Sequence, residues 1–306
     1  MFVFSSMLID FLIFILPVLV AVAFVTLLER KILGFSQLRL GPNKVSFSGL
    51  LQPFRDAIKL FTKQAEFNYN VNWKLFFFRP VIILATVLVL WRVAPLNSFS
   101  FKWPIIIIRL LVILRLGVYP LLIRGWASNS KYAALGALRG VAQTISYEIS
   151  LALIIMQLII VFISYNTKDQ LILHYSIIYT SPILLIIWLV ILLAETNRTP
   201  FDFSEGESEL VSGFNVEYGA TGFILIFLRE YAIILLFSAL TTTIFLSIDL
   251  FGPLGAICTT ILARIWIILR ATLPRYRYDL LMRTAWKTYL PGALGVISVF
   301  RLVLIF

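Results

Sequence analysis

The chain has 306 residues, 60% of them hydrophobic, with a formal net charge of +11 and only one Cys and one His. So little Cys and His excludes a disulfide framework, and it excludes a Cys/His metal site or iron–sulfur cluster built from this chain alone. The GxGxxG and GxxxxGK[ST] motifs are missing, which argues against nucleotide binding by this chain. Apolar runs near the ~20 residues that cross a bilayer recur along the sequence. We therefore predict an all-α, polytopic membrane protein.

The apolar runs predict about eight transmembrane helices in one integral membrane domain, 1–306. The expected spans are 3–28, 75–92, 104–123, 140–163, 177–195, 218–247, 254–270 and 288–306. The first run is too long for the apolar region of a cleaved signal peptide, so we expect it to remain as a span.

A different pattern occupies residues 49–64, between the first two spans. Apolar residues recur there every three or four positions: Leu51, Phe54, Ile58 and Phe61. Polar residues follow the same spacing on another face: Gln52, Asp56, Lys59 and Lys63. The pattern predicts an amphipathic helix that lies at the membrane interface or against a partner protein.

Basic residues predict the orientation, because loops rich in Lys and Arg stay on the inner side of a membrane. Most of them fall in the loops 29–74, 124–139, 196–217 and 270–287. We therefore expect these four loops to face the inside, cytoplasm or mitochondrial matrix. The loop 196–217 departs from the trend, with Arg198 as its one base against five acids.

This acidic loop is the most informative segment, because Asp202, Glu205, Glu207 and Glu209 fall within eight positions between two spans. Negative charge beside hydrocarbon is costly, and such residues usually mark an ion or proton route. A solvated acidic loop is the plainer alternative.

Carboxylates also fall inside predicted spans. Glu148 and Glu230 lie about two turns or more from the span ends. Lys and Arg at helix ends reach the interface through their long side chains, but a carboxylate inside a span needs a partner or water. We interpret both residues as members of a proton relay.

At this point the sequence resembles a known family. The blocks Gly49 to Lys63 and Pro200 to Gly213 are similar to subunit 1 of the proton-pumping NADH:ubiquinone oxidoreductase, respiratory complex I. Shorter motifs extend the resemblance over essentially the whole chain: 28–31, 41–43, 125–126, 128–132, 143–148, 194–198, 215–218 and 274–279. The residues in these motifs resemble those of the animal mitochondrial form.

The resemblance implies a core membrane subunit of an H+-translocating NADH:ubiquinone reductase, in the mitochondrial inner membrane with the four basic-side loops facing the matrix. Ubiquinone would be the substrate, while flavin, iron–sulfur clusters and any metal would belong to other subunits. Its partners would be the quinone-site subunits of the peripheral arm, the neighbouring membrane-arm subunits and membrane lipids, with no nucleic acid.

The resemblance also implies roles for individual residues. The quinone route would be lined or braced by Glu29, Arg30, Asp56, Lys59, Arg270 and Arg275. A charged chain for proton relay or coupling would comprise Arg139, Glu148, Glu195, Asp202, Glu205, Glu207, Glu217, Tyr218 and Glu230. Two alternatives stay open: the equivalent subunit of a membrane-bound hydrogenase, and a stand-alone proton-coupled transporter. Against the transporter, no paired repeats with matching broken helices are evident.

Several arginines lie where charge is unexpected, such as Arg109 and Arg115 in the third span and Arg264 in the seventh. A charge near the bilayer centre costs about 2.5–3.5 kcal/mol. Invertebrate mitochondria read AGA and AGG as Ser where the standard code gives Arg. We therefore hypothesise that some arginines are serines in the protein; the candidates are Arg55, Arg79, Arg92, Arg109, Arg115, Arg124, Arg229, Arg264, Arg283 and Arg301. Genuine arginines paired across helices or with another subunit are the alternative.

Overall fold

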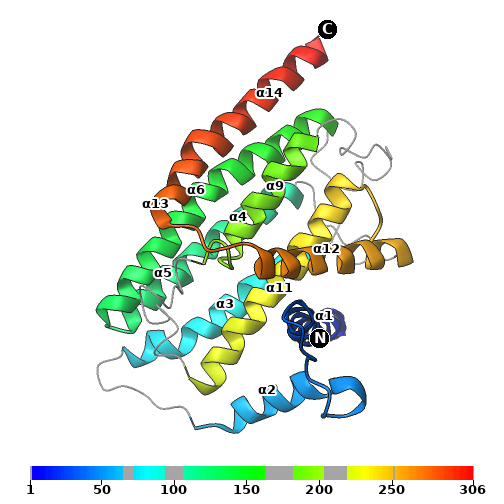
Figure 1. The fold of residues 1–306 in the computed structure, drawn as a ribbon, viewed down its shortest axis with the longest axis vertical. Coiled ribbons are helices and arrows are strands. Elements are labelled where there is room, and N and C mark those ends of the chain that lie inside the picture. Colours follow the sequence, from blue (N-terminus) through cyan, green and yellow to red (C-terminus); the bar gives the residue numbers. More distant parts are fainter. Residues whose placement is uncertain are drawn as a thin grey trace.

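A computed structural model describes residues 2–64, 72–93, 106–162, 182–202, 219–250 and 252–305. The described residues form helices and no strands, which confirms the predicted all-α class (Figure 1). Most of the acidic loop lies outside the described residues, including four predicted site residues: Glu205, Glu207, Glu217 and Tyr218.

Each of the eight predicted spans overlaps a helix. In chain order, the α-helices are α1 (Phe2–Ser36), α2 (Gln52–Thr62), α3 (Trp73–Val93), α4 (Ile106–Leu116), α5 (Val118–Ala127), α6 (Lys131–Phe162), α9 (Pro182–Glu195), α11 (Ala220–Phe245), α12 (Pro253–Thr272), α13 (Tyr278–Thr284) and α14 (Leu290–Ile305). A short 3₁₀ turn, η1 (Phe47–Gly49), precedes α2, and a π-helical turn, η3 (Ala285–Tyr289), joins α13 to α14. Within the described ranges, six segments are long and apolar enough to cross a bilayer, and α9 is a shorter apolar helix.

Three boundaries differ from the sequence prediction in ways that matter for the site. The third span is two helices, α4 and α5, which meet at Gly117 three residues before Pro120, a residue without a backbone N–H to donate. The first helix continues to Ser36, so Glu29 lies within α1 rather than at its end. The helix of the fourth predicted span, α6, begins at Lys131 and not at residue 140, so Arg139 lies inside this helix.

The helices pack in two groups, which contact each other through α3 and α5. One group joins α11 to α1, α3 and α12, and the other sets α6 beside α5, α9 and α14. In Figure 1, α6, α9 and α14 run side by side, while α2 crosses near the ends of α1 and α11. Close packing of α5 on α6 depends on Gly125, since a Cβ there would lie 2.5 Å from the Cβ of Ala137.

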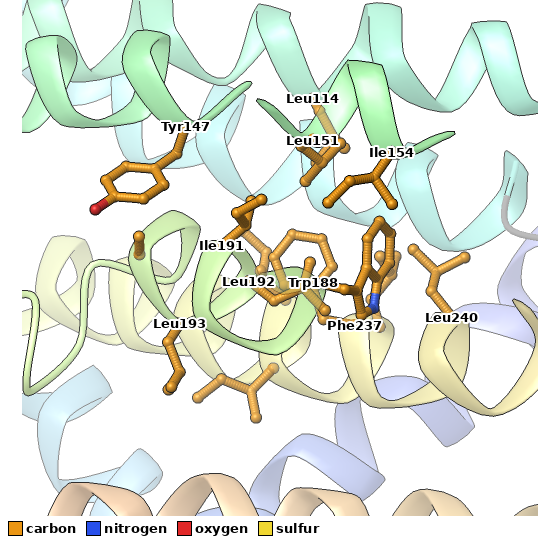
Figure 2. Close-up of a cluster of buried hydrophobic side chains, with 14 of the residues drawn as sticks. Leu114, Tyr147, Leu151, Ile154, Trp188, Ile191, Leu192, Leu193, Phe237 and Leu240 are labelled. Carbon is orange, nitrogen blue, oxygen red and sulfur yellow. The ribbon is translucent and has the colours of Figure 1, made fainter. Parts of the chain in front are cut away.

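The hydrophobic core lies where α6, α9 and α11 meet. Figure 2 shows Leu151 and Ile154 of α6 facing Trp188 of α9 and Phe237 of α11. Trp188 and Phe237 are each only 1% exposed, and the Trp188 ring lies 5.6 Å from that of Phe245. This core holds the C-terminal end of α9 and the middle of α11, near which the site residues described below lie.

The suspected arginines occupy unlike environments. Arg79 and Arg124 are 1% and 2% exposed, and Nε of Arg79 donates a hydrogen bond to the backbone carbonyl of Pro120. Arg264 is exposed in the middle of α12 and forms no ion pair with the described residues. An exposed charge midway along an apolar helix is costly in lipid, which supports the serine hypothesis most directly at this position.

We expect peptide masses to show Ser at Arg264, Arg109 and Arg115. Fragmentation of peptides from a protease that does not recognise Arg would read these positions directly, and trypsin would fail to cleave after them. Arg198 and Arg275, which are absent from the candidate set, are the internal controls and should read as Arg. Arginine masses at Arg109 and Arg115 would refute the hypothesis.

Candidate functional site

A buried group of charged residues gathers where α1, α11, α12 and the turn after α9 meet. It consists of Glu29 from α1, Arg198 from the turn, Glu230 and Tyr231 from α11, and Arg270 from α12, and we call it the Arg198 cluster. Glu29 and Arg270 lie in the C-terminal parts of α1 and α12, Glu230 and Tyr231 lie in the middle of α11, and Arg198 lies in the turn after α9. The packing of these helices brings the five residues together.

Arg198 is the hub of the cluster. Its Nη1 donates to both carboxylate oxygens of Glu29, at 3.1 and 3.3 Å, and its Nη2 donates to Oε2 of Glu230 at 3.2 Å. The guanidinium carbon lies 4.1 Å from the centre of the Tyr231 ring, a cation–π distance. Arg270 forms a second ion pair with Glu29. One guanidinium therefore connects two carboxylates on helices far apart in sequence.

The Arg198 side chain is 11% exposed, so its charge has little solvent support. Burial by itself disfavours a charged guanidinium, but Tyr231, Glu230 and Glu29 outweigh that effect and raise the pKa of Arg198. The guanidinium stays charged, and its planar fork suits two carboxylates at once. Removal of Arg198 would leave the buried carboxylate of Glu230 without its ion-pair partner and Glu29 with Arg270 alone.

A small cavity opens beside the cluster. Its polar lining includes Glu29, Thr199, Arg198 and Arg270, and Trp266 closes one side. The volume is about 20 Å³, enough for a water molecule, which needs roughly 10–15 Å³. Arg270, which also lines this cavity, is the most exposed ion-paired side chain of the cluster, at 38%.

The turn that carries Arg198 is held on several sides. The N–H of Phe201 donates to the carbonyl of Arg198 at 2.8 Å, and the N–H of Tyr276 donates to the carbonyl of Pro200 at 3.1 Å. Phe201 is 6% exposed and packs against the ring of Tyr276. Next along the chain, Asp202 accepts a hydrogen bond from Arg275 at 3.2 Å.

A second acidic pair lies on the α6 and α9 side. Glu148 of α6 and Glu195 at the end of α9 are close enough to interact electrostatically, and Glu195 is 6% exposed. Arg115 lies near Glu148 and Arg229 lies near Glu195. Both arginines are among the ten suspected serines, so their true identity decides whether this pair has counter-charges within the chain.

The remaining predicted site residues lie at the periphery. Arg30 forms an ion pair with Asp56, which also accepts a hydrogen bond from Gln52 at 2.9 Å, and Lys59 is exposed on α2. The apolar side of α2 is exposed as well, with Ile58 64% exposed. Arg139 lies over the Tyr278 ring at 5.8 Å.

Sequence reasoning did not single out Arg198 or Tyr231 as site residues. A signal for Arg198 was present, because it is the one base among five acids in the loop 196–217. Tyr231 carried no signal of its own beyond its place next to Glu230. No group of three or more His, Cys, Asp and Glu side chains gathers as a metal site in the part of the chain that the structure describes.

The chain is similar to known proteins along almost its whole length. A family model described as NADH dehydrogenase matches residues 9–301. NADH-ubiquinone oxidoreductase chain 1 of Aedes aegypti is 48% identical over 98% of this chain and 96% of its own length. The proteins of the same name from Locusta migratoria and Sarcophilus harrisii are 46% and 44% identical, and cover 95% and 94% of this chain and 93% of their own lengths.

Proposed function

The chain belongs to the NADH dehydrogenase family, as a subunit of the NADH:ubiquinone oxidoreductase complex, and from this premise we propose that it forms a wall of the ubiquinone site and couples quinone reduction to proton translocation. It is a multi-pass mitochondrial membrane protein. We further propose the inner membrane as its location, with the loops 29–74, 124–139, 196–217 and 270–287 on the matrix side.

One observation carries the proposal: a single buried guanidinium joins the two predicted groups of residues. Glu29 and Arg270 were assigned to the quinone route, and Glu230 to the coupling chain. Arg198 donates hydrogen bonds to both Glu29 and Glu230. A change of charge on the quinone route beside Glu29 would therefore affect Glu230 in the coupling chain through one residue, Arg198. A scaffold would need no such buried network, because well-packed apolar residues are often as stable as a buried ion pair.

The access route for quinone is proposed to follow α2. This helix contacts α1 and α11, and Phe54 packs edge-on against Phe24 of α1 with ring centres 6.0 Å apart. Its exposed apolar side suits the boundary between lipid headgroups and acyl chains, where ubiquinone would leave the bilayer. The cavity beside Arg198 is too small for the ring, so we propose that partner subunits complete the quinone pocket.

The proposed coupling runs outward from the reduced quinone. Reduction changes the local charge, which shifts how Arg270 and Arg198 share Glu29. The ion pair between Arg198 and Glu230 then becomes stronger or weaker. The acidic pair Glu148 and Glu195 responds next, and because its two carboxyl groups interact, their protonation changes together. Four members that lie outside the described residues are proposed to continue this chain: Glu205, Glu207, Glu217 and Tyr218.

The test of the proposal uses the intact assembly purified from gently solubilised membranes through this chain. Inhibitor-sensitive NADH:quinone reduction is expected, and a photoreactive short-chain quinone should label this chain on α1, α2 or α12, with inhibitor blocking the label. Recovery as a small particle without flavin or iron–sulfur partners would favour the transporter instead. Label confined to other subunits would reject this chain as a wall of the quinone site.

Asp56→Asn is expected to raise the KM for quinone about threefold while kcat changes little. The Arg30–Asp56 pair is solvent-exposed, and such pairs contribute about 0.2–1 kcal/mol, so the effect should be on quinone docking rather than on assembly. Steady-state kinetics with a short-chain quinone measures both constants. Asp279→Asn is the matched control, because Asp279 pairs with Arg277 at a 76% exposed position outside the cluster. An unchanged KM, or a fall in kcat alone, would contradict a docking role.

A further inference from the structure

Gln143 makes an unusual pair of hydrogen bonds. It lies on α6, is 0% exposed, and its single side-chain amide nitrogen donates both of its hydrogens to backbone carbonyls. One acceptor is the carbonyl of Ala194, in the last turn of α9, at 2.8 Å. The other is the carbonyl of Phe201, at 2.9 Å, on the far side of the turn. The amide therefore closes the segment 194–201 as a clasp.

The clasped segment carries Arg198. The residues between the two acceptors include the guanidinium that bridges Glu29 and Glu230. The backbone here is constrained on both sides of Arg198: Asn197 adopts a left-handed φ of 51°, and Phe201 donates back to the Arg198 carbonyl. A long side chain that must reach two carboxylates at hydrogen-bond distance depends on where its own backbone lies. The two bonds of Gln143 fix that position relative to α6.

The clasp also connects the two charged groups of the site. Gln143 lies five residues before Glu148 on the same helix, so the residue that fixes the turn belongs to the element that carries one half of the acidic pair. Ala194, its first acceptor, directly precedes Glu195, the other half. A shift of α6 relative to α9 would therefore move Arg198 as well.

We propose that Gln143 is a positioning residue, which holds the turn 194–201 so that Arg198 bridges Glu29 and Glu230 and thereby ties the Glu148–Glu195 pair to the Arg198 cluster. This inference rests on the proposed coupling function. Both side-chain hydrogen bonds of Gln143 to the described residues go to backbone carbonyls of the turn, through which it acts.

The same helix offers a matched control. Gln157 is 1% exposed on α6, and neither atom of its amide has a hydrogen-bond partner among the described residues. Gln143→Met and Gln157→Met make the same chemical change in equally buried positions, but only the first removes hydrogen bonds. Loss of a buried unsatisfied amide is neutral or stabilising, whereas Gln143→Met removes the side-chain donor from the Phe201 carbonyl and leaves the Ala194 carbonyl with only the 3.3 Å bond from the N–H of Asn197.

The experiment is a double-mutant cycle in the intact complex with Gln143→Met, Arg198→Met and the double variant. Gln143→Met is expected to lower NADH:quinone activity about tenfold and leave NADH:ferricyanide activity unchanged, as two lost hydrogen bonds displace Arg198. On the Arg198→Met background it should cause no further loss, because residues that act through one contact are not additive. Gln157→Met should match the native complex.

The outcomes separate this inference from the function on which it rests. A further tenfold loss in the double variant would show that Gln143 acts independently of Arg198 and would overturn the inference. Native activity of Gln143→Met beside an inactive Arg198→Met would overturn it while the coupling function stands. Native activity of both single variants, Gln143→Met and Arg198→Met, would instead contradict the proposed coupling function. If Gln143→Met fails to assemble, Gln143→Leu removes the N–H donors without adding a charge and carries the same test, with the same loss expected.

Discussion

Arg198→Met is expected to abolish most coupled turnover, with NADH:quinone activity reduced about a hundredfold and NADH:ferricyanide activity intact. Removal of one member of a buried ion pair costs about 3–5 kcal/mol, because the remaining charge stays buried without a partner. Without Arg198, Glu230 loses its ion-pair partner and Glu29 keeps only Arg270; the two carboxylates are 9% and 4% exposed. Methionine keeps most of the aliphatic length, so the loss reports on charge rather than on volume. Inhibitor-sensitive quinone reduction in isolated membranes measures the effect, and native gel electrophoresis of the same membranes reports whether the complex assembles.

Arg277→Met is the control for this change. Arg277 also pairs with a carboxylate, Asp279, but its side chain is 82% exposed, and exposed pairs contribute little. Its activity should stay near that of the native complex. Coupled turnover above half of the native rate in Arg198→Met would mean that the Arg198 cluster is not part of the coupling route.

The second large effect is expected from Glu148→Gln, which should lower coupled NADH:quinone activity by about a hundredfold and leave NADH:ferricyanide activity unchanged. Glutamine keeps the shape of the side chain but cannot carry a proton, and a positioned proton carrier contributes about 10²–10⁴ in rate. Glu148 lies within α6 and interacts with Glu195. Proton uptake by reconstituted vesicles, measured with the same preparation, should fall in parallel.

Two comparisons make the Glu148→Gln result specific. Asp279→Asn removes an exposed carboxylate and should leave turnover and proton uptake at native levels. Glu195→Gln should reproduce the Glu148→Gln loss, and the double variant should be little worse than either, because the two carboxyl groups interact. Normal coupled turnover in both single variants would remove this pair from the proton route.

The fold was largely predictable because hydrophobic length is a strong signal in a membrane protein. Apolar runs located all eight helical regions, since a span cannot form without them. The boundaries failed where sequence composition does not mark the end of a helix. Lys131 opens α6 well before its apolar run starts, and the last turns of α1 carry Glu29, Arg30 and Lys31, which read as a loop. A search for apolar runs does not detect such polar helix ends.

The site was predictable as a set of charged residues but not as a network. Glu230 was found because a carboxylate inside a span is conspicuous, whereas Glu29 came from the resemblance, which placed the two in different groups. Their meeting on Arg198 depends on the packing of α1 against α11 and on the path of the turn after α9, which no local pattern encodes. Gln143 was harder still, because an uncharged amide on an apolar helix gives no sign that its two hydrogens reach 51 and 58 residues along the chain.

The sequence separations in the Arg198 cluster have a consequence for how the protein is made. Glu29 leaves the ribosome before its partners Arg198 and Arg270, which follow 169 and 241 residues later. Until then the ion pairs that join α1 to the turn after α9 and to α12 cannot form, and the nearest charges to Glu29 along the chain are those of Arg30 and Lys31. The contacts of α1 in the cluster are therefore complete only after α12 has been made. In this subunit, a helix that is synthesised early is among the last to settle.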